Sequence, residues 1–340
     1  MKLLYVGIDE AGYGPMLGPL CVGLAGVVID TFDPAGGAPD LWERLRDAVC
    51  KAPRDKARRI AINDSKALKL SNQGKRHPLT HLERGVLSAL GGSISTDAEL
   101  FDALGAKPGE GPWYGGPELV LPLASTSDAI GLDANRLSHA SANAGIRFVD
   151  LRCHITSERA FNAMVRETGT KAATTASAFM AALKRVAASD EARGVIESGG
   201  AVRVVCDRLG GRLSYIPLLE RAGTLGVRSI EESPRACVYD LSLSGTEMRV
   251  VFMPEADAGH LPVALASMIA KLVRELMMLR FNRYWSARMP ELKPTAGYTT
   301  DARRWLADAG EILTDAERKA LVRAGTLGVR SIEESPRACV

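Results

Sequence analysis

Metal-binding patterns of cysteine and histidine are missing from this sequence of 340 residues. It has 6 cysteines, none in a Cys-x-x-Cys spacing, and only 5 histidines. The cysteines stand mostly among apolar neighbours, at positions 21, 50, 153, 206, 237 and 339. This predicts reduced, buried thiols and argues against a disulfide framework or a zinc site.

Long apolar runs are missing as well. No segment reaches the length of a membrane-spanning helix, and a chain that is 46% hydrophobic and 24% charged is ordinary for a soluble globular protein. Asp9 and Glu10 interrupt the apolar start too early for a signal peptide. We therefore expect a cytoplasmic protein without membrane contact. The net charge of +3 permits nucleic-acid binding but does not indicate it.

Apolar, β-branched runs alternate with segments of helical periodicity, which predicts an α/β architecture. The predicted strands cover residues 2–8, 20–29, 146–155, 202–206 and 248–253. The predicted helices cover residues 39–50, 81–91, 159–188 with Ser157 as N-cap, 260–284 and 300–323. The Gly- and Pro-rich residues 105–118 predict a loop or insertion.

The segment RAGTLGVRSIEESPRACV occurs twice, at 221–238 and again at 323–340. A solenoid would contain several tandem, diverged copies. One perfect copy at the end of the chain instead predicts a loose tail behind a complete fold. The alternative is that the second copy competes for the place of the first, or exchanges between protomers.

Carboxylates follow two of the predicted strands. Asp9 and Glu10 end the first strand, and Asp207 follows residues 202–206. A single acidic pair at a strand end is most simply exposed to solvent. Two strands that each deliver acids to the edge where α/β sheets collect ligands favour a site.

A buried helix predicted around residues 264–281 carries a polar stripe, in which Ser267, Lys271 and Glu275 recur every four residues. Lys271 and Glu275 could form an ion pair along the helix. Because buried charge needs a partner, the stripe also suits a site, and we expect Glu275 to join the other acids.

Four clustered carboxylates cannot all stay ionised without cations. Oxygen ligands without His or Cys select Mg²⁺ or Mn²⁺. Two such ions about 4 Å apart stabilise the attacking and leaving oxygens of a phosphodiester displacement, with a metal-activated water as nucleophile. The acids would then hold the ions.

Glycines at positions 12, 14 and 18 let the loop after Asp9 and Glu10 lie against a ligand. The short polar segment 64–66 is Asp-Ser-Lys, which would otherwise indicate a helix N-cap with a surface Lys. Tyr298 could stack on a sugar or base, or be a half-buried core residue.

These motifs together resemble the ribonuclease HII family, the type 2 ribonucleases H. The matching segments, in the family's order, are GIDEAGYGPMLGP (7–19), DSK (64–66), Asp207, ALASMIAKLVRE (264–275) and AGYTT (296–300). The resemblance implies an RNase H-like fold, with a mixed central sheet flanked by helices. It also implies a metal-dependent endoribonuclease that cleaves the RNA strand of RNA–DNA hybrids, or ribonucleotides embedded in duplex DNA.

We accordingly expect a catalytic domain over residues 1–310 and a C-terminal helix over 311–322. Residues 72–145 have no counterpart in the family and form an insertion. The resemblance implies that two Mg²⁺ or Mn²⁺ ions are held by the catalytic acids Asp9, Glu10, Asp207 and Glu275. It also implies substrate contacts by Gly12, Tyr13, Gly14, Ser65, Lys66, Lys271, Arg274 and Tyr298. The loop and Tyr298 would contact the 2′-hydroxyl, and the three cations would contact phosphates.

Two positions depart from the family pattern. Tyr13 stands where the family has Arg between two glycines, and Glu275 is one methylene longer than the usual Asp. Three other functions stay open. They are a DNA nuclease of the RNase H-like superfamily, a hybrid-binding protein without catalysis and, more distantly, a two-carboxylate glycosidase.

Overall fold

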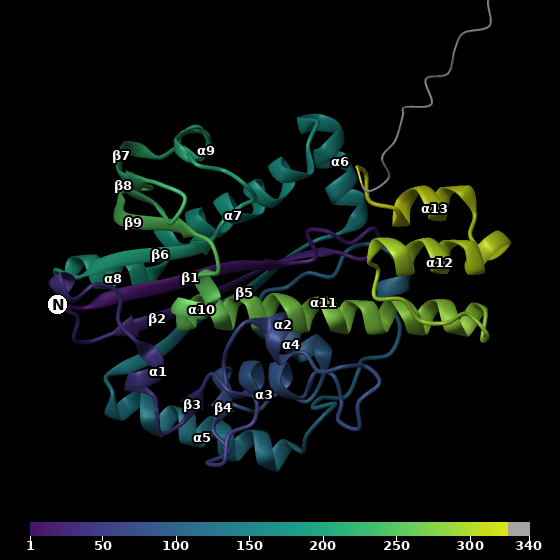
Figure 1. The fold of residues 1–340 in the computed structure, drawn as a ribbon, viewed down its shortest axis with the longest axis horizontal. Helices are drawn as coiled ribbons and strands as arrows, with labels where there is room; N and C mark the ends of the chain where they lie inside the picture. Colours follow the sequence, from purple (N-terminus) through teal and green to yellow (C-terminus); the bar gives the residue numbers. More distant parts are fainter. Residues whose placement is uncertain (326–340) are drawn as a thin grey trace, which may run out of the picture.

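The chain folds around a seven-stranded mixed sheet (Figure 1). The structure is a computed structural model, and it describes residues 1–325. The strand order is β5-β2-β1-β6-β9-β8-β7. β2 is antiparallel to β1 and β5, whereas β6 is parallel to both β1 and β9. The predicted mixed sheet flanked by helices is confirmed.

The strands of the main sheet are β1 (Leu3–Ala11), β2 (Leu20–Ile29), β5 (Ile146–Thr156), β6 (Ala201–Asp207), β7 (Leu225–Glu232), β8 (Cys237–Leu243) and β9 (Thr246–Met253), while β3 (Val49–Cys50) and β4 (Ile60–Ala61) pair separately. The α-helices are α1 (Leu41–Arg44), α2 (Ser65–Leu68), α3 (Thr80–Ala89), α4 (Asp97–Ala103), α5 (Ser127–Asn143), α6 (Glu158–Thr168), α7 (Lys171–Ala187), α8 (Asp190–Glu197), α9 (Ile216–Arg221), α10 (Ala256–Gly259), α11 (Leu261–Arg288), α12 (Thr299–Ala309) and α13 (Asp315–Leu321). Short 3₁₀ turns occupy Pro34–Gly36, Pro112–Tyr114 and Gly310–Ile312.

The central strands are buried on both faces. Every residue of β2 is buried, and β1 is buried at all but one position. Helices α7 and α8 cover one face of the sheet, and α11 with α3 covers the other (Figure 1). Strands covered on both sides need continuous apolar sequence rather than alternation, which is the pattern that predicted them.

Helix α11 lies unusually close to the sheet, because glycines face it. A Cβ on Gly23 would lie only 2.0 Å from the carbonyl oxygen of Ala266. Any larger residue would push the helix away from β2. This close contact places the next residue of the helix, Ser267, beside the end of β1.

Two helix predictions are confirmed to within a few residues, since α3 (Thr80–Ala89) and α11 (Leu261–Arg288) lie at the expected ranges 81–91 and 260–284. The expected helix 159–188 is two helices, because Gly169 ends α6 in the left-handed conformation. Ser157 caps α6 as predicted, with its side chain accepting from the Ala160 N–H.

Two other helix predictions need correction. Residues 39–50 form only the four-residue α1, and the chain then turns into β3. Residues 300–323 divide into α12 and α13 around the 3₁₀ turn at Gly310–Ile312. Residues 72–145, predicted as an insertion, hold α3, α4 and α5, and helix α3 packs against α11.

The cysteine prediction holds for the described residues: Cys21, Cys50, Cys153, Cys206 and Cys237 are buried and free, and Cys339 lies outside them. Within residues 1–325, no helix combines the length and apolar character needed to cross a membrane.

The prediction of a loose tail over 323–340 is wrong at its start. Arg323 is only 1% exposed. Ala324 is hydrogen-bonded through its N–H to Asn162 Oδ1 at 2.6 Å. Residues 326–340 lie outside the described part of the chain.

Candidate active site

Three of the predicted acids come together where β1 and β6 end. These strands are parallel neighbours, so their carboxyl ends lie at the same edge of the sheet. Asp9 and Glu10 stand near the end of β1, and Asp207 is the last residue of β6. The negative charges of Glu10 and Asp207 both act on Asp9.

Burial and mutual repulsion make these acids hard to ionise together. Burial first, then Glu10 and Asp207, raise the pKa of Asp9 well above its ordinary value. Burial, followed by the charge of Asp207, raises the pKa of Glu10 to about 7, with Lys66 acting in the opposite direction. Burial also raises the pKa of Asp207, while the hydrogen bond that its Oδ1 accepts from the Ala256 N–H opposes the shift.

A fourth acid, Asp257, joins this edge of the sheet from α10, which follows β9. Burial, then the carboxylates of Asp64 and Asp207, raise the pKa of Asp257 to about 6. Asp257 was not among the residues predicted from the sequence. The signal was nevertheless present, because Asp257 closely follows the strand predicted at 248–253, as Asp207 follows its own strand.

Glu275 lies elsewhere, which corrects the expectation that it joins the acids. Its two carboxylate oxygens are 2.8 Å from Lys271 Nζ and 2.9 Å from Lys69 Nζ. Burial opposes ionisation, but these two lysines lower the pKa of Glu275 overall. Ser267, whose hydroxyl lowers the pKa of Asp9 in opposition to burial, lies eight residues earlier, so Glu275 is about 12 Å farther along the helix axis.

The predicted Asp-Ser-Lys segment borders the acids. Asp64 caps α2 by accepting from the Lys66 N–H at 2.9 Å. Ser65 is buried and accepts from Ser267 Oγ at 2.9 Å, which fixes α2 against α11. Lys66 is exposed, and its charge lowers the pKa of Glu10. The segment thus places an exposed cation beside the carboxylates.

The acids fit a hard divalent cation by donor type and charge. Glu10 Oε2 is buried and has no hydrogen-bond partner, which is costly unless a cation or water satisfies it. Asp9, Asp207 and Asp257 add further oxygen donors, the set that Mg²⁺ and Mn²⁺ prefer. Among residues 1–325, no three Asp, Glu, His or Cys side chains converge on one point suited to an ion. The fit therefore rests on chemistry rather than on a preformed cage.

Both α11 cations expected to contact phosphates are buried, which corrects that expectation. Arg274 has 0% exposure and donates to the carbonyl oxygens of Leu17 at 3.3 Å and Ala296 at 3.1 Å. Lys271 is 7% exposed and pairs with Glu275. Arg274 instead stabilises the loop after β1.

That loop, residues 12–18, is called the glycine loop below. The N–H groups of Met16 and Leu17 donate to the Gly297 carbonyl oxygen at 2.8 and 3.1 Å. Gly12 has φ +95°, and a Cβ there would lie 2.6 Å from the Pro19 carbonyl oxygen. Only glycine fits this position, so the sequence pattern reflects a tightly fixed backbone.

Two tyrosines are exposed at the glycine loop, one within it and one in the segment that it contacts. Tyr13, between Gly12 and Gly14, is 41% exposed, and Tyr298 at the start of α12 is 46% exposed. The Arg274 guanidinium lies 5.4 Å from the centre of the Tyr298 ring. Exposed aromatic rings beside a fixed polar backbone are available to stack on a sugar or base.

The structure is similar to solved ribonucleases H of type 2. RNase HII of Archaeoglobus fulgidus, solved in a complex with PCNA, is 17% identical, with 99% of this chain and 98% of that chain covered and a TM-score of 0.41. Ribonuclease H2 from Pyrococcus horikoshii OT3 is 17% identical, with coverages of 94% and 97% and a TM-score of 0.43. Bst-RNase HIII, solved with Mn²⁺, is 15% identical, with coverages of 95% and 66% and a TM-score of 0.38. No protein-family model and no curated protein matches the sequence.

The fold is defined by the strand topology of this chain. β5, β2 and β1 form an antiparallel unit, β6 is parallel to β1, and β9 is parallel to β6. This mixed five-stranded arrangement is the RNase H-like core that the motifs implied.

We expect the metal-free protein to lose stability as the pH rises from about 4.5 to about 7. The pKa of Glu10 is about 7 in the folded chain against 4.5 for the free side chain, so the folded state binds more protons within this window. The shift corresponds to on the order of 3 kcal/mol. A divalent cation held by these acids would replace the protons, so we expect Mn²⁺ to raise Tm more at high pH than at low pH. Calorimetry with EDTA or Mn²⁺ across this range tests it, and a pH-independent metal effect contradicts it.

Proposed function

We propose that this protein is a divergent member of the ribonuclease HII family. It would cleave the RNA strand of RNA–DNA hybrids, or ribonucleotides embedded in duplex DNA, in the cytoplasm. The observation that supports this most directly is the gathering of Asp9, Glu10 and Asp207 at one sheet edge, with Asp257 beside them. The glycine loop follows β1 directly, so the acids and a sugar-contacting backbone are neighbours.

Asp9, Glu10, Asp207 and Asp257 would hold Mg²⁺ or Mn²⁺. When bound there, such ions make water nucleophilic at neutral pH and offset the charge that develops on the phosphodiester. The reaction adds water to phosphorus and breaks the bond to the 3′ oxygen, which takes up a proton. The products are a 5′-phosphate and a 3′-hydroxyl.

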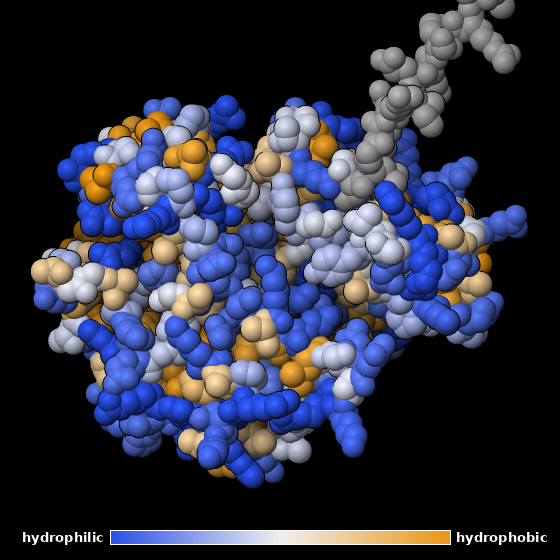
Figure 2. Space-filling view, viewed as in Figure 1, coloured by the Kyte–Doolittle hydropathy of each residue, from blue (hydrophilic) through white to orange (hydrophobic). Residues whose placement is uncertain are grey.

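The substrate contacts come from exposed groups around the acids. Backbone polar groups of Gly12, Tyr13 and Gly14 would bind the 2′-hydroxyl, the feature that distinguishes RNA from DNA. Tyr298 would stack on the neighbouring sugar or base, and Lys66 would pair with a phosphate. Hydrophilic residues cover much of the middle of the face shown in Figure 2, which suits a charged polymer.

The test is cleavage of a labelled DNA duplex that contains one ribonucleotide, beside an all-DNA duplex, with Mg²⁺ or Mn²⁺. An Asp207→Asn enzyme purified in parallel excludes a contaminating nuclease. We expect a cut only in the ribonucleotide-containing strand, and none with the variant.

Two outcomes would overturn the proposal in different ways. Cleavage of both duplexes indicates a DNA nuclease of the RNase H-like superfamily, with the same acids but without recognition of the 2′-hydroxyl. No cleavage with either metal, together with retained binding of an RNA–DNA hybrid, indicates a non-catalytic hybrid-binding protein.

A further inference from the structure

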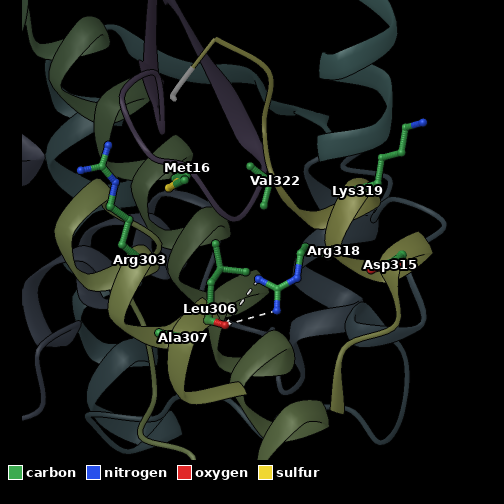
Figure 3. A pocket seen from close by; sticks show the side chains of 8 residues that line it. All are labelled: Met16, Arg303, Leu306, Ala307, Asp315, Arg318, Lys319 and Val322. Carbon is green, nitrogen blue, oxygen red and sulfur yellow. Dashed lines mark hydrogen bonds between the residues drawn. The ribbon is translucent and has the colours of Figure 1, made fainter. Parts of the chain in front are cut away.

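The chain segment that follows α13 is fixed between the glycine loop and α6. The Arg323 N–H donates to the Met16 carbonyl oxygen at 2.9 Å. Asn162 on α6 donates to the Val322 carbonyl oxygen at 2.9 Å and accepts from Ala324. Figure 3 shows Val322 and Met16 lining the same cavity, of about 550 Å³, beside α12 and α13.

The Arg323 side chain reaches under the glycine loop. Its guanidinium donates to the carbonyl oxygens of two successive residues, Gly12 and Tyr13, the second at 3.1 Å. It also stacks on the Phe161 ring, 3.8 Å from the ring centre. The residue is only 1% exposed.

Burying a guanidinium costs desolvation free energy that an apolar side chain of similar size would not cost. Burial first, then the like charge of Arg274, lower the pKa of Arg323 to about 10, while Glu158 opposes the shift. The side chain therefore stays charged at neutral pH. An apolar residue would pack at this position without the desolvation penalty, so the retained charge indicates that its hydrogen bonds matter.

The two carbonyl contacts determine which way the loop's N–H groups face. In a trans peptide the C=O and the following N–H point in opposite directions. The carbonyls of Gly12 and Tyr13 point to the buried Arg323, so the N–H groups of Tyr13 and Gly14 point away from it. Tyr13 and Gly14 are both exposed. Two successive N–H groups that point away from the protein are available as donors to an oxygen ligand.

We propose that Arg323 is a positioning residue, which orients the Tyr13 and Gly14 N–H groups toward the sugar and phosphate oxygens of a ribonucleotide. This inference rests on the proposed function. It assigns to the first residue of the C-terminal duplicate a role that the first copy does not have. Arg221, which begins the first copy, is exposed at the end of α9.

The duplication supplies a matched control, since the same 17 residues follow Arg221 and Arg323 in the sequence. We would compare Arg323→Ala, Arg323→Lys and Arg221→Ala in the full chain. Two readouts are needed: hydrogen exchange of the amides in residues 11–18, and kcat and KM on the ribonucleotide-containing duplex.

We expect Arg323→Ala to increase amide exchange in the glycine loop but not in the middle of β1. Because small displacements of a reacting group cost up to about a hundredfold in rate, we expect at least a tenfold loss of kcat in the folded variant. Arg323→Lys should recover part of both effects, since an ammonium can still donate to one carbonyl. Arg221→Ala should match the wild type.

Equal exchange and kinetics for Arg323→Ala and Arg221→Ala would overturn the inference. If Arg323→Ala does not fold, Arg323→Lys decides: wild-type Tm with faster loop exchange supports positioning, and wild-type exchange contradicts it. If the wild type cleaves neither duplex, the proposed function fails. Faster loop exchange in the folded variants would then still identify Arg323 as the residue that fixes the loop.

Discussion

An Asp9→Asn variant should lose cleavage by on the order of a thousandfold, because the proposed metal site then lacks a charged ligand worth several kcal/mol to the transition state. Its metal-free form should at the same time unfold at a higher temperature than the wild type at mildly alkaline pH. Asp9 is buried, and both burial and the charges of Glu10 and Asp207 raise its pKa. The neutral amide keeps an oxygen that can accept from the Glu10 N–H, now bonded at 2.8 Å, without the cost of ionisation.

The measurement pairs cleavage rates in Mn²⁺ with calorimetry in EDTA. Asp190→Asn serves as a control, since that side chain is 91% exposed at the start of α8. Retained activity in Asp9→Asn would remove Asp9 from the catalytic set. Lost activity with a lowered Tm would mean that the acid serves folding instead.

The strands were predictable because burial on both faces demands continuous apolar sequence. Strands β1, β2, β5, β6 and β9 all match the predicted runs to within a few residues. Strand β7 was not predicted, because nearly all of its residues are exposed at the edge of the sheet and its sequence lacks an apolar pattern. The helix breaks at Gly169 and Gly310 were also missed, since periodicity continued across them.

The site was predictable where an acid directly ends a buried strand, as at Asp9 and Asp207. It was misassigned where the inference depended on a helix face. The four-residue spacing of Ser267, Lys271 and Glu275 places them on one side of α11, but it does not say how far along the helix the site extends. Lys69, which completes the pairing of Glu275, comes from another part of the chain, and its contribution was not visible in the spacing.

Arg274 was misassigned for a related reason. Sequence shows that an arginine is present but not which way it faces, and the expected phosphate contact requires exposure. In the fold its Nη2 donates to carbonyl oxygens of the glycine loop and of the segment before Tyr298. A buried cation on a core-facing helix position is the physical clue that favours such an internal role.

Replacing each carboxylate in turn by its amide should distinguish the role of Asp257 from that of Glu275. We expect Asp257→Asn to weaken Mn²⁺ binding and reduce cleavage by about a hundredfold or more, because it removes an oxygen donor beside Asp207. We expect Glu275→Gln to keep most of the activity and the metal affinity. It should instead lower the free energy of unfolding by on the order of 1–3 kcal/mol, because Lys271 and Lys69 lose their charged partner.

The two roles, metal binding and ion pairing, predict opposite results. They are distinguished by measuring Mn²⁺ binding by titration calorimetry, cleavage rates and Tm on both variants. A carboxylate that binds metal destabilises the metal-free fold, so its removal leaves Tm in EDTA unchanged or raised. A carboxylate in a buried ion pair stabilises the fold with or without metal, so its removal lowers Tm in both conditions. If Glu275→Gln abolishes Mn²⁺ binding while Asp257→Asn does not, the assignment from the helix spacing was right. The fourth ligand would then reach the site through a rearrangement of α11 that breaks its two lysine pairs.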